Sequence, residues 1–203
     1  MQIYSQLTPL ALNGAAGSAV AMGYFDGIHR GHRAVIQGAV QWAQAHGACP
    51  ALFTFELPSG SRMKGKRLLS TQDKHALVQS LGVQHYLCPE FAAIQSLPPE
   101  KFVQGIVEDC QARALFCGEN FTFGAKAAGD PELLQALCRP LGVEVVVVPM
   151  AQYEDKPISS TRIRTALEGG DIPAANAMLG MPYAIRFPVG HGAGLGHTLG
   201  AVS

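Results

Sequence analysis

Residues 23–32, GYFDGIHRGH, lie between an apolar run at 18–22 and a segment at 32–46 whose apolar residues recur at helical spacing. The apolar run predicts a strand, and the periodic segment predicts a helix. In sheets built from strand–loop–helix units, ligands bind beyond the carboxyl ends of the strands. This stretch therefore predicts a ligand site where the first of these strands ends.

The same alternation of strands and helices continues along the chain. The run VEVVVV at 143–148 does not alternate with polar residues, so we expect both faces of that strand to be buried. The predicted fold class is α/β, a Rossmann-like doubly wound parallel sheet of about five strands with a short helical C-terminal extension. Further strands are predicted at 51–55, 83–87, 114–117 and 143–148, and further helices at 70–81, 99–109, 131–141, 160–168 and 172–179.

The composition predicts a globular protein that binds its ligands through local groups. Apolar residues make up 48% of the 203 residues and charged residues 15%, which supports a substantial core. Lys plus Arg and Asp plus Glu number 15 each, so no overall charge would attract nucleic acid or an anionic membrane. Five cysteines without a CxxC pair, and an N-terminus without a signal-peptide pattern, indicate reduced thiols in a cytoplasmic protein.

Two histidines three positions apart form the first candidate site. His29 and His32 fall near a predicted helix start, where free N–H groups bind anions, and their rings would point to the same side. Such donors suit phosphoryl transfer, which depends on positioning and charge stabilisation. A zinc pair and two ordinary surface histidines are the alternatives, although no Cys or acidic residue stands at a matching offset for zinc.

The second candidate is ISSTRIR at 158–164, also at a predicted helix start. Its hydroxyl groups could simply cap the helix, which would leave Arg162 and Arg164 as solvated charges. Alternatively, this helix start binds an anion, with Arg164 clamping the outer phosphates. Together with 23–32, the stretch favours a phosphate site built from both ends of one domain.

The patterns GxFDGxHxGH and ISSTxxR resemble the nucleotidyltransferase superfamily. Five further stretches occur in the order of one branch of this superfamily: RLLST at 67–71 with Lys74, LPPEKFV at 97–103, GENFTFG at 118–124 with Gly129-Asp130, GDI at 170–172 and MLGMPY at 178–183. They resemble the bifunctional bacterial riboflavin kinase/FAD synthases. The resemblance implies a domain at 1–183, including helices at 158–180, that transfers AMP from ATP to FMN and releases pyrophosphate.

The resemblance also implies roles for individual residues. The implied catalytic residues are His29 and His32, which stabilise the α-phosphoryl group, and Arg164, which holds the departing pyrophosphate. The FMN phosphate is the nucleophile and needs no general base, and Mg²⁺ enters bound to ATP rather than in a protein site. The implied ATP-binding set also contains Gly23, Phe25, Asp26, Asn120, Ser160 and Thr161.

Three phenylalanines, Phe55, Phe121 and Phe123, are candidates for flavin binding. Phe121 and Phe123 could stack on a flavin or adenine ring, because aromatic faces stabilise each other. The alternative is that one of the two belongs to the core.

The sequence departs from the family pattern in two places. TFELPS at 54–59 stands where the family has TFxPHP, so the histidine of that pattern is missing. The cation-rich stretch that follows, 61–67, suits either a solvated loop or a flap that closes over phosphates. Residues 184–203 resemble the opening of the riboflavin kinase domain without its barrel, so we expect no riboflavin phosphorylation. Two alternatives to FMN adenylylation stay open: a flavin- or nucleotide-binding remnant, and nucleotidyl transfer to another phosphorylated acceptor.

Overall fold

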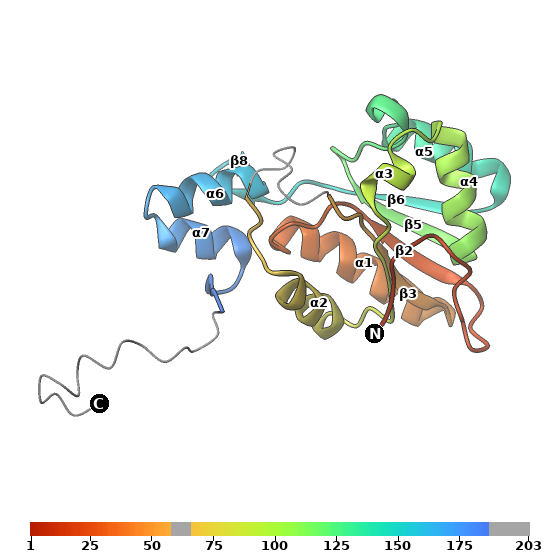
Figure 1. Ribbon diagram of the computed structural model, residues 1–203, viewed down its shortest axis with the longest axis horizontal. Helices are drawn as coiled ribbons and strands as arrows, with labels where there is room; N and C mark the ends of the chain where they lie inside the picture. The colour runs from red at the N-terminus through yellow and green to blue at the C-terminus, as the bar shows by residue number, and fades with distance from the viewer. Residues whose placement is uncertain (58–65, 187–203) are drawn as a thin grey trace, which may run out of the picture.

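The structure, a computed structural model, describes residues 1–57 and 66–186 and is built on a six-stranded parallel sheet (Figure 1). The strands lie in the order β1-β4-β3-β2-β5-β6, and every neighbouring pair is parallel. From the central strand β2 the chain runs outward through β3 and β4, then crosses back to β5 and β6, which confirms the predicted doubly wound fold. The strands are β1 (Gln2–Tyr4), β2 (Ser18–Met22), β3 (Cys49–Phe53), β4 (His85–Leu87), β5 (Ala112–Gly118) and β6 (Glu144–Val148).

Helices cover both faces of this sheet (Figure 1). Helices α1 and α2 pack on one face, and α4 and α5 pack on the other. Two further helices, α6 and α7, lie beyond one end of the sheet. The helices are α1 (Arg30–His46), α2 (Thr71–Ser80), α3 (Phe91–Ile94), α4 (Pro99–Cys110), α5 (Pro131–Cys138), α6 (Ser160–Glu168) and α7 (Ile172–Leu179).

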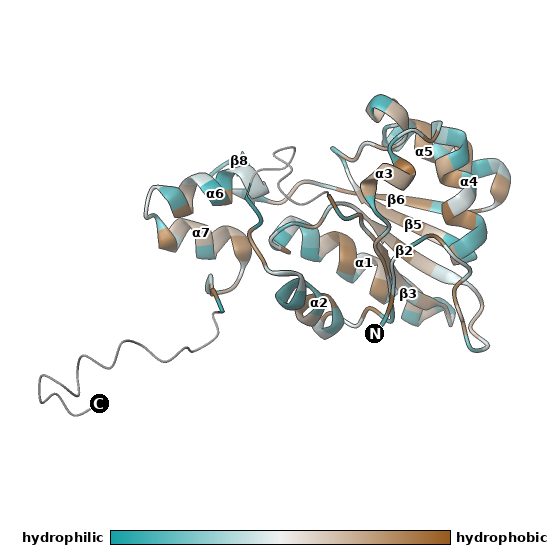
Figure 2. Cartoon of the chain, viewed as in Figure 1, coloured by the Kyte–Doolittle hydropathy of each residue, from teal (hydrophilic) through white to brown (hydrophobic). Residues whose placement is uncertain are grey.

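Side chains of the central strands alternate between two hydrophobic clusters, as the pleat of a strand requires. Val20 and Met22 of β2 belong to the cluster under α4 and α5, whereas Ala19 and Ala21 belong to the cluster under α1. Figure 2 shows the strands as mostly brown, hydrophobic residues, and a teal stretch on the outer helix α2. Burial on both faces explains why the central strands are continuous apolar runs.

Two features of the sheet differ from the prediction. Strand β1 is not evident from the sequence pattern, yet it pairs with β4 and raises the number of strands to six. Strand β6 pairs only with β5 among the described strands, so it forms an edge, and the valines of β6 are half-buried. The expectation that both faces of this strand are buried is therefore wrong, because helices cover an edge strand less completely than a central one.

The two C-terminal helices share a third hydrophobic cluster. Ile163 of α6 and Met178 and Leu179 of α7 are buried in it, together with Leu68 from the segment before α2. Leu68 therefore joins the predicted helical extension to the sheet domain. Residues 187–203, which hold most of the stretch that resembles a kinase domain, lie outside the described residues.

Candidate active site

A cavity of about 1190 Å³ lies at the carboxyl ends of the strands and reaches the loops that follow β2 and β5. After these two neighbouring strands the chain turns to opposite faces of the sheet, and doubly wound folds bind ligands at such a point. Every residue that the sequence predicted to bind ATP or flavin lines this cavity. They are Gly23, Phe25, Asp26, His29, His32, Phe55, Asn120, Phe121, Phe123, Ser160, Thr161 and Arg164.

His29 is the N-cap residue of α1, and its capping contact determines which ring nitrogen carries the proton. Its Nδ1 accepts a hydrogen bond from the backbone N–H of His32 at 3.3 Å. A neutral imidazole has one N–H, so a ring that accepts at Nδ1 carries its hydrogen on Nε2. His29 therefore keeps one N–H donor beyond its capping contact, on a side chain that lines the cavity.

The two imidazoles stack, with ring centroids 3.6 Å apart and an interplanar angle of 17°. Burial lowers the pKa of His29 to about 4. Burial, and then the charges of His29 and Lys74, lower the pKa of His32 well below its usual value, so both rings are neutral near pH 7. The Nδ1 of His32 is buried without a hydrogen-bond partner among the described residues, and a polar ligand atom there would relieve that cost.

The loop between β2 and α1 has an unusual backbone. Phe25 and Ile28 adopt positive φ angles of 53° and 44°, which cost energy for residues that carry a Cβ. Of the glycines in 23–32, Gly27 has a positive φ of 86°, whereas Gly23 and Gly31 do not. A Cβ on Gly27 would lie 2.7 Å from Cδ1 of Leu68. Backbone strain of this kind persists only where surrounding contacts hold it, and it clusters at ligand sites.

Asp26 joins three segments of the chain at the wall of the cavity. Its Oδ1 accepts a hydrogen bond from the backbone N–H of Leu68 at 3.0 Å, and its Oδ2 accepts one from Nη2 of Arg164 at 2.7 Å. Its backbone carbonyl accepts a hydrogen bond from the Ser160 hydroxyl at 2.8 Å. The two predicted motifs therefore touch each other. Because both carboxylate oxygens are engaged, Asp26 is better suited to organise the site than to contact ATP.

Arg164 is held at two of its three guanidinium nitrogens. Nε donates to the carbonyl of Lys66 at 2.6 Å, and Nη2 donates to Asp26. Nη1 has no hydrogen-bond partner among the described residues. A guanidinium fixed in this way offers one pre-oriented edge to an anion, at little further cost in side-chain entropy.

The start of α6 combines helix capping with groups that face the cavity. The Ser159 hydroxyl caps the helix by accepting from the backbone N–H of Arg162 at 3.2 Å. The next two residues, Ser160 and Thr161, line the cavity. The Arg162 guanidinium donates instead to carbonyls of the hairpin formed by β7 (Gln152–Tyr153) and β8 (Lys156–Pro157). Ser159 therefore caps the helix, Ser160 and Thr161 line the cavity, and Arg162 anchors the hairpin.

Aromatic side chains cover part of the cavity wall. Phe55 lies between Tyr24 and Phe91, with its ring centroid 5.1 Å from each of theirs. Phe121 is half-buried, and its ring stacks on Phe123 at a centroid distance of 5.7 Å. Phe123 is only 5% exposed and belongs to the hydrophobic core, which is one of the two alternatives that the sequence left open.

Sequence reasoning missed some residues of the cavity. Phe91 comes from α3, a single turn that no sequence pattern indicates, and Tyr24 stands inside the first motif without a signal of its own. The cation-rich stretch 61–67 lies mostly outside the described residues, as do Pro58 and Ser59. Of its described residues, Lys66 lines the cavity and Arg67 forms an ion pair with Glu56.

The lining of the cavity favours anions over metal ions. Its acidic residues are Asp26 and Glu168, against Lys66, Lys126 and Arg164 among the described cations. Within residues 1–57 and 66–186, no group of three His, Cys, Asp or Glu side chains could hold a metal ion. The charge balance therefore suits a polyanionic ligand.

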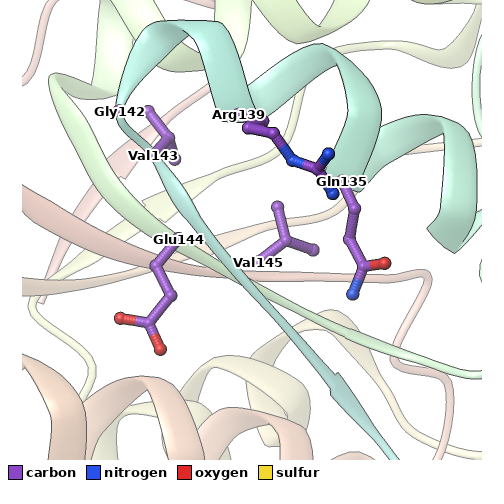
Figure 3. Close-up of a pocket in the computed structure, with 6 residues that line it drawn as sticks. All are labelled: Gln135, Arg139, Gly142, Val143, Glu144 and Val145. Atoms are coloured by element: carbon purple, nitrogen blue, oxygen red, sulfur yellow. The ribbon is translucent and has the colours of Figure 1, made fainter.

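A second hollow, of about 480 Å³, lies at the edge of the sheet beside the first half of β6 (Figure 3). Its Glu144 carboxylate also accepts a hydrogen bond from the Trp42 indole at 2.9 Å. The hollow contains no residue of either motif, and we assign no ligand to it. It is lined by Gln135, Arg139, Gly142, Val143, Glu144 and Val145.

Comparisons with known proteins point to one family. The model of the FAD synthetase family matches residues 13–162. A bifunctional riboflavin kinase/FMN adenylyltransferase of Bacillus subtilis is 34% identical over 193 residues, covering 91% of this chain and 60% of the relative. The protein of the same description from Escherichia coli K12 is 30% identical over 190 residues, covering 91% and 61%. The chain thus spans about three-fifths of the length of these relatives.

One solved structure extends the likeness to three dimensions. The crystal structure of a Streptococcus pneumoniae protein, described as a macrolide-efflux protein, has a TM-score of 0.78 and 27% sequence identity. The match covers 96% of this chain and 67% of that chain. In this chain, none of the helices within the described ranges has the length and apolar character needed to traverse a bilayer.

Proposed function

Because the chain belongs to the FAD synthetase family, we propose that it transfers the AMP portion of ATP to FMN, giving FAD and pyrophosphate. One observation carries this proposal: the two motifs line one cavity, and the Asp26–Arg164 ion pair joins them. A single triphosphate can then contact the histidines with one part and the arginine with another.

The proposed reaction forms one bond and breaks one. A terminal phosphate oxygen of FMN attacks the α-phosphorus of ATP. The bond between the α-phosphorus and the oxygen that bridges to the β-phosphorus breaks, and pyrophosphate leaves with that oxygen. The attacking phosphate is ionised at neutral pH, so no side chain needs to remove a proton. Catalysis then depends on positioning and on donors aimed at the developing charge.

The geometry suits a division of roles among the residues of the cavity. The Nε2–H of His29 would donate to an oxygen of the α-phosphoryl group, with His32 beside it. The Nη1 of Arg164, which has no partner among the described residues, would hold the pyrophosphate. Thr161 would bind a further phosphate oxygen through its hydroxyl, and Ser160 through its backbone N–H, because its hydroxyl already donates to the Asp26 carbonyl. Asn120 lines the same cavity near the end of β5, where it would contact the nucleotide.

Flavin would bind beside the aromatic residues of the wall. Phe55 and Phe121 are half-buried and line the cavity, so each could cover part of a flavin ring. Phe123 would act through Phe121, because it is itself buried in the core.

Magnesium would enter with ATP. Both oxygens of Asp26 are engaged, and Glu168 alone would not provide the several oxygen ligands that Mg²⁺ requires from a protein cage. We also propose a cytoplasmic location, because all five cysteines are free thiols and four of them are buried, which is typical of a reducing compartment.

The test is to incubate the purified chain with FMN and Mg-ATP and to follow FAD and pyrophosphate. We expect the two products in equal amounts. His29→Ala should reduce the rate of FAD formation by roughly 10²- to 10³-fold while changing FMN affinity little, because it removes a donor to developing charge. Arg139→Ala, in the second hollow, is the matched control and should leave the rate unchanged.

Other outcomes separate the alternatives. Binding of FMN without formation of FAD would favour a binding remnant. Release of pyrophosphate with a different phosphorylated acceptor, but not with FMN, would favour a different transferase. Wild-type turnover in His29→Ala would show that the role assigned to this histidine is wrong.

A further inference from the structure

Lys74 is a basic residue near the site that the roles above do not use. It lies in the first turns of α2, and its Nζ donates to the carbonyl of Tyr24 at 2.8 Å and to Oγ1 of Thr54 at 3.2 Å. The Thr54 hydroxyl itself donates to the same Tyr24 carbonyl at 2.9 Å. One ammonium group thus joins α2, the end of β3 and the loop after β2.

The carbonyl that Lys74 holds is at the start of the strained loop. Tyr24 directly precedes Phe25, whose φ is positive, and the loop continues to Ile28, also at positive φ, and to His29. A non-glycine residue keeps such a conformation only where its surroundings over-determine it. Two donors on the Tyr24 carbonyl, together with the contacts of Asp26, provide that constraint.

Charged and titratable groups surround the ammonium from several elements. Its own side chain is half-buried, and burial lowers the pKa of Lys74 to about 8. Burial lowers the pKa of His32 and of His75, and the charge of Lys74 lowers both further. The Tyr24 ring also lies beneath Nζ, 5.3 Å from its centroid. Among the neighbouring charges, Cys88, Asp26 and Glu56 raise the pKa of Lys74 and Arg67 lowers it.

We propose that Lys74 is a positioning residue for the proposed transfer: its ammonium group fixes the Tyr24 carbonyl, and thereby the loop that carries His29 and His32. The kinetic test of this inference rests on the proposed function, because it measures FAD formation. Lys74 does not line the cavity and acts through the loop rather than on the substrate.

The stability of a Lys74 variant distinguishes a positioning role from a purely structural one. Burying an ammonium group disfavours its charged form, so the contact of Lys74 is made at a cost to the folded state. In Lys74→Met the Tyr24 carbonyl keeps the Thr54 hydroxyl as a donor, and the buried charge is gone. We therefore expect the urea midpoint of Lys74→Met at pH 7 to equal or exceed that of the wild type.

The experiment compares Lys74→Met with Gln72→Met, an exposed change on the same helix. We expect Lys74→Met to lower kcat on the order of 10- to 100-fold, because a misplacement of reactive groups by about 1 Å can cost about 10²-fold. KM for ATP and for FMN should stay within about threefold, and Gln72→Met should match the wild type. The wild-type kcat should also decline above about pH 8, whereas Lys74→Met should lack that limb.

A spectroscopic measurement tests the same inference without catalysis. In ¹H–¹⁵N spectra of the imidazole nitrogens, Lys74→Met should shift the signals of His29 and His32 and raise the pKa of His32, whereas Gln72→Met should not. If the wild type formed no FAD, the proposed function would fail while these spectra still decided the role of Lys74. Unchanged spectra, unchanged kcat in an active enzyme, or a loss of stability that parallels the loss of activity would each overturn the inference.

Discussion

The stability of the fold should depend on pH through His29. Burial lowers the pKa of this imidazole to about 4, whereas an unfolded chain titrates near 6.5. Between these values the unfolded chain binds a proton that the folded chain does not, so the free energy of unfolding decreases as the pH falls from 6.5 to 4. The sign would be the opposite for a histidine whose pKa is raised by an acidic partner.

The size of the effect follows from the same two values. They differ by roughly 2.5 pKa units, and each unit corresponds to about 1.4 kcal/mol, so His29 alone should contribute about 3 kcal/mol of destabilisation by pH 4. The buried ring of His32 acts in the same direction. Since domains are typically stable by only about 5–15 kcal/mol, this is a substantial share.

Urea unfolding at pH 7, 6, 5 and 4.5 measures the effect, and His29→Gln isolates it. Glutamine does not titrate, so the stability of the variant should fall less steeply with acid than that of the wild type. The difference between the two curves should grow mainly between pH 6.5 and 4. Parallel curves across this range would show that His29 is not a buried neutral imidazole.

Two further predictions concern the walls of the cavity. Asp26→Asn and Arg164→Ala should each weaken ATP use, with Arg164→Ala mainly raising KM for ATP. In a double-mutant cycle the two effects should be far from additive, because the ion pair at 2.7 Å makes Asp26 act through Arg164. Additive effects would mean that Asp26 acts on ATP independently. Phe121→Ala should raise KM for FMN with little loss of stability. Phe123→Ala should instead destabilise the fold by about 3–5 kcal/mol in urea unfolding, because it leaves a cavity at a buried site. Similar stability losses in the two variants would contradict this division of roles.

The sequence alone was sufficient for features that depend on near neighbours. The strand at 18–22, the helix after it and the helix-start position of His29 follow from periodicity and capping, which involve residues within about four positions. The spacing of three also predicted that the rings of His29 and His32 point to the same side, but it did not predict that they stack. The position of 23–32 at the crevice followed from the rule that parallel strands present their carboxyl ends at one edge. That ISSTRIR reaches the same crevice was a hypothesis from the pairing of the two motifs and did not follow from this rule.

Only the tertiary structure decided which groups contact each other across that edge. Asp26 and Arg164 are 138 positions apart, and no periodicity predicts that their side chains pair rather than both facing a ligand. The same holds for Lys74, whose partners Tyr24 and Thr54 come from two other segments. Contacts of this kind depend on how the strands are ordered and how the helices pack.

The outer strands illustrate the same limit. The apolar run of β6 has the composition of a central strand. It nevertheless lies at the edge of the sheet, because no further described strand pairs with its other side. Strand β1 has only three residues and takes its place by pairing with β4, more than eighty residues later. Local pattern therefore determined the type of each long element and the motifs at its end, because those depend on short-range geometry. Strand order, edge exposure and side-chain pairing were decided by folding, because they depend on contacts between distant parts of the chain.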